Sequence, residues 1–311
     1  MPRWLKWTLG ILAVLIIAIG AGYWWFIVDG SPPSNLMAKT IDIARVRAMA
    51  DELVGPKATE VRIETVASMT FPTTAVVAGE GWDALPMGVY SYQLVFPDQM
   101  IVIDTALDEK GGSTLRATFH ADAYARMDAA MANATQIFVT HEHPDHLGGV
   151  LAYPDPDLLR GRLQLTREQV ATAGRYGGFT VPPGILAEVS PLEYDDYRAV
   201  APGVVLIKAP GHSPGSQMIY VQRADGREFL FTGDIGWSLR NIEEVRPLAR
   251  LVSQFMLGED RDAVFGQLAG IRDLHAAEPT IVIVPGHDAA VIDALVGDQT
   301  MVEGFSAPAS P

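Results

Sequence analysis

The 311-residue chain contains no cysteine. This absence excludes a disulfide framework, and it also excludes a thiolate metal ligand and a cysteine nucleophile. Any metal-binding or catalytic site in the chain must therefore be built from imidazole, carboxylate or other nitrogen and oxygen groups. A chain without cysteine is compatible with either a reducing or an oxidising compartment, so composition alone leaves its location open.

Basic residues are also scarce. The chain has 23 Lys and Arg against 37 Asp and Glu, which gives a formal net charge of −14. An acidic surface repels a phosphate backbone, so we expect no nucleic-acid partner. Hydrophobic residues make up 49% of the chain, which is enough to build the core of one large α/β domain or two small ones. The sequence does not specify an oligomeric state.

The longest run without a charged residue extends from Trp7 to Val28, after Arg3 and Lys6. As a helix, this run would be about 33 Å long, which matches the hydrocarbon core of a bilayer. We predict a single-pass anchor in the inner (cell) membrane. The basic flank would stay in the cytoplasm and the rest of the chain would lie on the extracytoplasmic side.

A cleaved signal peptide is the alternative to an anchor. Ala18, Gly20 and Gly22 are small enough to permit cleavage, but the apolar run is long for a signal peptide. We therefore expect a transmembrane anchor, a linker, one folded domain and a tail, at residues 4–28, 29–38, 39–300 and 301–311.

The densest group of metal-binding residue types is the stretch His141-Glu142-His143-Pro144-Asp145-His146, which follows the apolar run 137–139. The apolar run indicates a buried strand. Buried imidazoles cost free energy unless both ring nitrogens have partners, so three of them within six positions are not a packing device. Neutral imidazoles and carboxylates are good ligands for zinc and similar divalent ions. The stretch therefore predicts a metal site at a strand end, where α/β folds usually bind ligands.

Three later strands end in a similar way. Pro-Gly-His follows apolar runs at 204–207 and 281–284, and Thr-Gly-Asp follows the run at 228–231. Proline stops a strand and glycine allows a sharp bend, so that a ligand-type side chain projects from the edge of the sheet. The side chains predicted to join the first cluster are His212, Asp234 and His287.

An earlier hairpin, predicted at 90–96 and 100–103, ends at Asp104. We expect Asp104 to accept a hydrogen bond from a ligand imidazole, because such imidazoles need a partner to fix their tautomer. Capping of the next turn is the alternative role. Periodicity further predicts helices at 39–54, 241–256 and 261–277 and a strand at 73–77, with a frayed tail from Glu303.

Together these motifs resemble the metallo-β-lactamase fold superfamily of hydrolases over residues 60–295. The resemblance rests on His-x-His-x-Asp-His at 141–146, Gly-His at 211–212 and 286–287, and Gly-Asp at 233–234. It implies an α/β fold, a four-layer αββα sandwich in which two sheets lie face to face with helices outside.

The resemblance also implies a dinuclear centre with two divalent metal ions. The first ion would be held by His141, His143 and His212 and the second by Asp145, His146 and His287, with Asp234 bridging both. A donor set made only of nitrogen and oxygen suits zinc, while iron or manganese at one position stays open.

The expected activity is cleavage of a lactone, ester or thioester bond of a small molecule by a hydroxide that bridges the two metals. Asp145 would orient the nucleophile or relay a proton. Trp237 and Phe179 would form apolar pocket walls. Many lactonases of this family carry Tyr at the position of Trp237, and the family usually has Gly at the position of Ala106.

Three alternatives remain at this stage. A phosphodiesterase of the same fold is compatible with the ligand set. A β-lactamase is less favoured, because β-lactamases of this fold usually lack the bridging Asp. A non-catalytic metal-binding module is least favoured, because structural zinc sites close with four ligands and need no bridging carboxylate.

Overall fold

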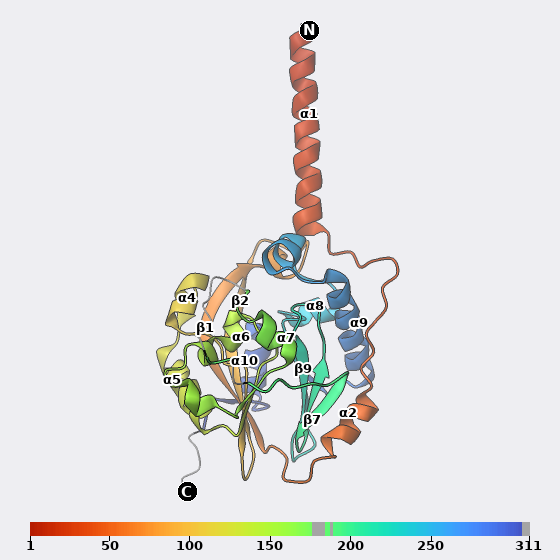
Figure 1. Cartoon of the computed structure of the whole chain (residues 1–311). Coiled ribbons are helices and arrows are strands. Elements are labelled where there is room, and N and C mark those ends of the chain that lie inside the picture. Colours follow the sequence, from red (N-terminus) through yellow and green to blue (C-terminus); the bar gives the residue numbers. More distant parts are fainter. Residues whose placement is uncertain (176–183, 187–188, 307–311) are drawn as a thin grey trace.

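The computed structural model describes residues 1–175, 184–186 and 189–306. Two β-sheets pack against each other and helices cover the outer face of each, so that the layers follow one another from left to right in Figure 1. The predicted α/β class is therefore confirmed. The helices described are α1 (Arg3–Tyr23), η1 (Trp24–Val28), α2 (Ile43–Ala50), α3 (Thr73–Val76), α4 (Glu109–Leu115), α5 (Ala121–Asn133), α6 (Pro144–Leu151), η2 (Pro156–Leu159), α7 (Arg167–Thr172), α8 (Leu239–Glu243), η3 (Leu251–Leu257), α9 (Arg261–Ala277) and α10 (Ala289–Gly297).

The first sheet has the strand order β12-β1-β2-β3-β5-β6, with β4 paired to β1 beside this path. Its strands are β1 (Glu60–Pro72), β2 (Ala84–Val95), β3 (Met100–Ile103), β4 (Thr118–Phe119), β5 (Gln136–Phe138), β6 (Leu163–Gln164) and β12 (Val302–Glu303). The β2–β3 pair is antiparallel, as predicted for this hairpin, whereas β3 and β5 are parallel. Ile103 lies opposite Phe138 in the parallel pair. Asp104 and the His141–His146 stretch therefore leave the sheet at the same edge.

The second sheet has the order β11-β10-β9-β8-β7. Its strands are β7 (Tyr197–Ala201), β8 (Val204–Lys208), β9 (Gln217–Gln222), β10 (Glu228–Gly233) and β11 (Val282–Pro285). Only one pair among these described strands is parallel, namely β10 with β11, in which Gly233 lies opposite Pro285. This register brings Asp234 and His287 out of neighbouring strand ends.

Three apolar layers hold the sandwich together. The layer between the sheets contains Ile103 and Phe138 from one side and Phe229 and Phe231 from the other. One outer layer packs α5 and α6 on the first sheet, and the other packs α2 and α9 on the second. Because the strands are clamped on both faces, their ends provide a rigid frame for side chains at the edge.

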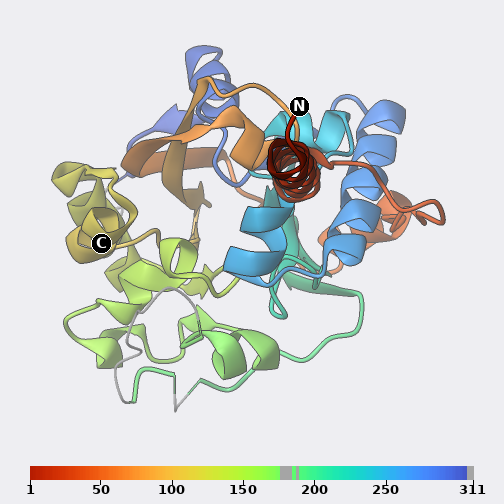
Figure 2. The ribbon, with the colours of Figure 1, turned by 90° about the horizontal axis from the view of Figure 1, so that it is seen from above.

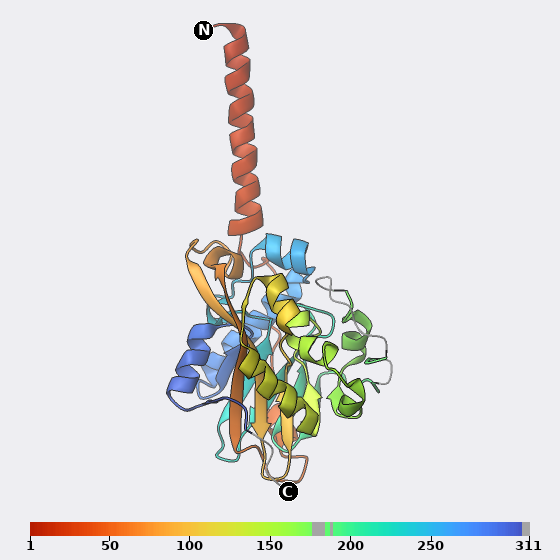
Figure 3. The same ribbon diagram turned by 90° about the vertical axis from the view of Figure 1, so that its left-hand side faces the viewer.

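The helix α1 continues directly into the π-helical turn η1 and projects from the domain as a rod (Figures 1 and 3). The stretch Arg3–Val28 has 26 residues; the mean hydropathy of its most apolar 18-residue window is 2.4, and none of that window is buried against the protein. By length and composition it is able to cross a membrane.

Two predicted elements are wrong. Thr73–Val76 form the short helix α3, and not a strand, because the N–H groups of Thr73 and Thr74 bind carbonyls of the loop that returns to β2. The single helix predicted at 241–256 is interrupted: α8 ends at Glu243 and η3 begins at Leu251. Pro247 lies between them and has no N–H to continue a helical ladder.

Two predicted boundaries also change. The helix predicted at 39–54 covers only Ile43–Ala50, while α9 agrees with the prediction for 261–277. The tail is not frayed at Glu303, because β12 pairs with β1 and places Val302 opposite Arg62. Beyond β12, the N–H of Phe305 donates to Glu64 Oε1 at 2.6 Å.

Candidate metal centre

The turn after β5 carries the first cluster into α6. His143 occupies the N-cap of α6 and Pro144 its first turn, where the fixed φ of proline suits a helix start. Asp145 and His146 therefore belong to the first helical turn. Gly149 allows this turn to sit deep in the fold, since a Cβ there would lie 2.3 Å from the carbonyl oxygen of Thr105.

Glycine also permits close approach at the ends of β10 and β11. Gly233 adopts a φ of 52° beside Thr140, and a Cβ on Gly286 would lie 2.2 Å from Asp234 Oδ1. A side chain at Gly233 would clash with Thr140, and a side chain at Gly286 would push Asp234 away from the cluster. His212 follows the end of a third strand, β8, and lies in the loop between β8 and β9.

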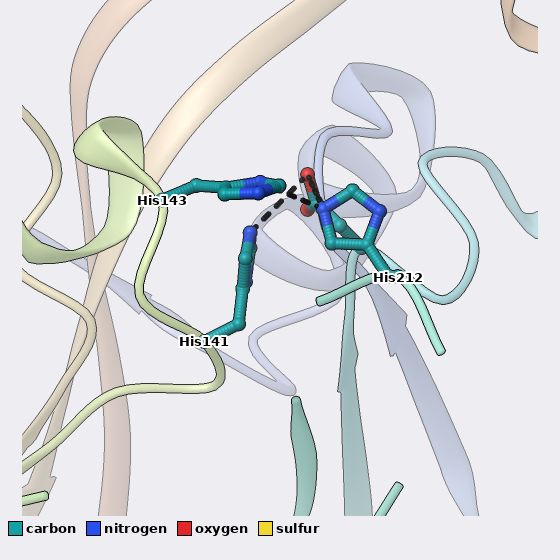
Figure 4. A group of neighbouring side chains, drawn as sticks. His141, His143 and His212 are labelled. Atoms are coloured by element: carbon teal, nitrogen blue, oxygen red, sulfur yellow. Dashed lines mark hydrogen bonds and ion pairs between the residues drawn. The ribbon is translucent and has the colours of Figure 1, made fainter. Parts of the chain in front are cut away.

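All seven predicted ligand residues come together in the structure. They form two groups of side chains, each with its donor atoms within 4.8 Å of one another. The first group is His141, His143, His212 and Asp234, and the second group is Asp145, His146, Asp234 and His287. Figure 4 shows the rings of His141, His143 and His212 converging from separate segments.

Asp234 is common to the two groups and lies between them. Its Oδ2 is 3.2 Å from His287 Nε2 and 3.5 Å from His212 Nε2, while its Oδ1 is 3.2 Å from His146 Nε2. One carboxylate thus faces ligand-type nitrogens of both groups, as the bridging role predicted for it requires.

Hydrogen bonds on the outer ring nitrogens orient the imidazoles. Asp104 Oδ2 lies 2.9 Å from His146 Nδ1, and Glu259 Oε1 lies 2.5 Å from His212 Nδ1. A carboxylate or carbonyl oxygen only accepts, so each of these Nδ1 atoms carries the proton. His287 Nδ1 donates in the same way to the carbonyl of Gly88 at 2.8 Å. The Nε2 atoms of these three rings face Asp234 in the centre. Burial disfavours the charged form, but the neighbouring carboxylates raise the pKa of all three rings, so that a metal bound at Nε2 would displace a proton.

The hydrogen bond predicted for Asp104 is therefore present. The same carboxylate accepts from the backbone N–H of Thr140 at 2.6 Å and from its hydroxyl at 2.9 Å. Asp104 adopts a left-handed φ of 57° and Ala106 one of 46°. Such conformations are uncommon for residues other than glycine and are retained where surrounding contacts demand them.

The electrostatics of the centre follow from burial and mutual proximity. Burial alone would raise the pKa of Asp234, but the imidazoles of His287 and His146 hold it well below its ordinary value. Burial lowers the pKa of His141 and His143 well below the ordinary value. These two rings are neutral near pH 7, which is the form of histidine that binds metals.

The residues present fit a pair of divalent cations. Among the described residues, His141 Nε2, His146 Nε2 and Asp234 Oδ1 are buried and make no hydrogen bond of good geometry, although His146 Nε2 and Asp234 Oδ1 lie 3.2 Å apart. Unpartnered buried polar atoms are rare, and three of them facing one another need a ligand between them. Nitrogen and carboxylate oxygen are the donors that zinc accepts. The role of the individual side chains as ligands stays a prediction.

Two carboxylates of the centre had no predicted role. Glu142 is fully buried and accepts from the hydroxyls of Thr172 and Ser213 at 2.5 and 2.8 Å, and thus connects the first cluster to the loop of His212. Its position in the sequence between His141 and His143 could have indicated such a role. Glu259 lies 47 residues from His212 along the chain, and no motif marks it.

Of the two predicted pocket residues, only one lies within the described residues. Trp237 is 9% exposed, and its ring stands edge-on to His287 with centroids 5.4 Å apart. It also packs against Phe71 at 5.8 Å. An aromatic ring thus lies beside the second group, and the role of Trp237 as a pocket wall stays a prediction. Phe179 lies outside the described residues.

Comparison with known proteins gives three findings. The family model described as "Metallo-beta-lactamase superfamily" matches residues 85–287. An N-acyl homoserine lactonase of Bacillus thuringiensis is 26% identical over 152 residues, which are 49% of this chain and 55% of that protein. An N-acyl homoserine lactonase of Bacillus cereus matches to the same extent. The chain thus spans about half the length of the curated relatives it matches.

Similar solved structures include an N-acyl homoserine lactone hydrolase with N-hexanoyl-L-homoserine bound at its catalytic metal centre. It has a TM-score of 0.61 and 18% identity, over 76% of this chain and 96% of that chain. A dizinc quorum-quenching lactonase, AidC, has a TM-score of 0.53 and 14% identity, over 74% and 90% of the two chains. These similarities establish a shared fold.

Proposed function

The chain belongs to the metallo-beta-lactamase superfamily, and we propose that it is a metal-dependent hydrolase that opens the ring of a lactone. The observation that carries the proposal is the meeting of two ligand groups at Asp234. A purely structural zinc site closes with four ligands, whereas paired sites with a shared carboxylate serve hydrolysis. Zinc is the proposed metal because every donor is nitrogen or oxygen.

Bound at this centre, two divalent cations would activate water and polarise the carbonyl of the substrate. The residues of the chain set the position of both reactants. His141, His143 and His212 are fixed by burial, and Asp234, which belongs to both groups, sets the distance between them. Their rigidity reduces the reorganisation that the reaction requires.

Asp145 is the proposed proton carrier. Its side chain is 18% exposed, whereas those of His287 and Asp234 are almost completely buried, and its Oδ2 lies 3.6 Å from His287 Nε2. Water adds to the carbonyl carbon and loses a proton to this carboxylate. The ring C–O bond then breaks, and the same proton passes to the leaving alcohol oxygen. The products, in one opened chain, are a hydroxyl and a carboxylic acid, and the acid releases its proton to solvent to give the carboxylate.

The choice of a lactone rests on two supports. The curated relatives are N-acyl homoserine lactonases by name, although this chain spans about half of their length. The apolar wall formed by Trp237 and Phe71 beside His287 suits a substrate with an apolar tail. Linear esters and thioesters share the same carbonyl chemistry and belong in the test.

The test is turnover by the full chain loaded with zinc, using N-acyl homoserine lactones, linear esters, thioesters, a β-lactam and bis-nitrophenyl phosphate. We expect lactone opening to be fastest, measured as acid released, and to be lost in His141→Ala. Faster cleavage of the phosphodiester would favour the phosphodiesterase. Protein that holds two metals and opens no lactone would contradict the proposal.

We further propose that α1 and η1 anchor the chain in the cell membrane with the catalytic domain on the extracytoplasmic side. The parts would be an anchor at 4–28, a linker at 29–38 and a domain from residue 39, which β12 extends beyond residue 300. Arg3 and Lys6 precede the apolar stretch and favour a cytoplasmic N-terminus. Resistance to alkaline extraction, together with protease access from outside, tests both statements.

A further inference from the structure

Large apolar side chains gather around the foot of α1. We call this group the collar and define it as Trp24, Trp25, Trp82, Leu251, Phe255 and Met256. All six are exposed, and the exposed fractions reach 59% for Phe255 and 69% for Met256. Seen along α1 in Figure 2, the helix stands over the domain with η3 beside its foot. Isolated apolar residues on a surface are common, but a contiguous group marks an interaction site.

The collar joins three segments that are far apart in the sequence. The ring of Phe255 in η3 lies 6.0 Å from Trp25 and 5.2 Å from Phe26. Trp82, in the loop between α3 and β2, stacks on Tyr23 at 6.5 Å and donates its indole N–H to the tyrosine hydroxyl at 3.1 Å. The foot of α1 is therefore held between two parts of the domain.

Polar contacts fix this junction. Arg250 lies over the ring of Trp25 at 4.7 Å and pairs with Asp29 at 2.9 Å. Arg261 donates to the carbonyl of Asp29 at 2.7 Å. Because the residue that follows η1 is bound by two arginines, the domain keeps a defined position against the helix.

The length of the helix sets the depth of the collar. The uncharged stretch from Trp7 to Val28 is about 33 Å long as a helix, whereas the hydrocarbon core of a bilayer is about 30 Å thick. With Arg3 and Lys6 in the inner headgroup region, the last turns of α1 and η1 lie where the acyl chains meet the outer headgroups. Phe255 and Trp82 touch these turns and must lie at the same depth.

We propose that the collar is buried in the outer headgroup region of the bilayer and holds the domain against the membrane. The proposal rests on the anchoring of α1 proposed above. Tryptophan is enriched at this depth, where its ring contacts acyl chains and its N–H remains hydrated. The lipid surface would cover the side chains of Phe255 and Met256, which are otherwise exposed to water.

The collar is also close to the metal centre. Leu248 and Val252, on either side of the start of η3, share an apolar cluster with Trp237. Trp237 in turn contacts His287. This apolar cluster therefore connects η3, which carries part of the collar, with the second ligand group. A substrate with an acyl tail would concentrate in the bilayer at this surface, next to the enzyme.

Because the chain has no cysteine, single labels can be placed without background. Phe255→Cys and Met256→Cys, each in the full chain, would carry an environment-sensitive fluorophore in vesicles of phosphatidylethanolamine and phosphatidylglycerol. Ala224→Cys is the matched control, because it is exposed in the hairpin between β9 and β10, at the opposite end of β10 from Asp234. We expect blue-shifted emission and quenching by a headgroup-level lipid quencher at 255 and 256 only, with protection from iodide.

Alkaline extraction of the same vesicles separates the two proposals. If the chain stays in the vesicles while labels at 255 and 256 behave like the label at 224, the anchor is supported and the collar proposal is overturned. If the chain is extracted and the labels show no lipid contact, both membrane proposals fail, although the hydrolase proposal is unaffected. Lipid contact at 224 equal to that at 255 would show general adsorption and would also overturn the collar.

Discussion

The two ligand groups share Asp234, yet different parts of the chain support them. In the first group His212 is oriented by Glu259, which follows η3, the helix that touches the foot of α1. In the second group His146 is oriented by Asp104 at the end of β3. One group thus depends on a loop beside the proposed membrane surface, and the other on the edge of a clamped sheet.

The groups also differ in their access to water. His141, His143 and His212 are at most 4% exposed, whereas Asp145 of the second group is partly exposed. Catalytic metal sites keep a position open for substrate, while closed sites hold a metal more passively. We infer that water and substrate reach the metal of the second group, whereas the residues of the first group stay in place during the reaction.

Asp234→Asn should have the largest effect, because it removes the charge that both groups share. We expect both metals to bind weakly and lactone opening to fall by at least about 1,000-fold, beyond the 10–100-fold typical of residues that only orient a ligand. Metal analysis after dialysis and initial rates measure the two effects. Asp225→Asn, at an exposed hairpin position, is the control. Two metals retained with an unchanged rate would contradict the shared role.

During treatment with a chelator, the two groups should lose their metals at different rates. We expect two phases of metal release, the faster from the second group because Asp145 is open to solvent. A chromogenic chelator monitors both phases. The residual lactonase activity should fall at the rate of the faster phase. Asp145→Asn should accelerate only the faster phase, by about tenfold. Release in one phase that this variant leaves unchanged would show that the groups do not differ.

Much of this centre is predictable because its residues lie at strand ends. The stretch 141–146 is local in sequence, and each Gly-His or Gly-Asp follows an apolar run that is visible without a structure. Convergence then follows from parallel pairing, which places the carboxyl ends of β3 and β5 together and likewise those of β10 and β11. The motifs therefore specify both the residues and the edge at which they meet.

The supporting residues are less predictable because they depend on tertiary contacts. Glu259 reaches His212 only because α8, Pro247 and η3 redirect the chain, and the apolar spacing of 241–256 predicts one continuous helix instead. The spacing fits a helix although Pro247 argues against it. At 73–77 the β-branched residues favour a strand, but the backbone bonds of Thr73 and Thr74 close a loop.

Glu259→Gln and Asp104→Asn test the carboxylates that orient His212 and His146. Each substitution keeps the shape of the side chain and weakens one carboxylate–imidazole bond, so we expect a 10–100-fold loss of affinity for one metal. Glu259→Gln should act on the first group and Asp104→Asn on the second. Titration of metal-free protein with zinc, followed by stoichiometry, distinguishes them. Glu243→Gln, at an exposed position of α8, is the control. Equal losses at both sites in either variant would contradict separate support.

Glu142→Gln should have the smallest effect on activity and confine it to the first group. The carboxylate of Glu142 connects the cluster turn to the loop of His212 through Thr172 and Ser213. Glutamine keeps one acceptor oxygen but removes the charge, so we expect the free energy of unfolding to fall by about 1–3 kcal/mol.

Activity of Glu142→Gln should fall by less than about tenfold, since Glu142 contacts no second-group residue in its described bonds. Denaturant unfolding measures the first effect and zinc titration locates the second. Thr172→Val, which removes one of the donors, should show a smaller change of the same kind. A loss of metal from the second group in Glu142→Gln would mean that the two groups move as one unit.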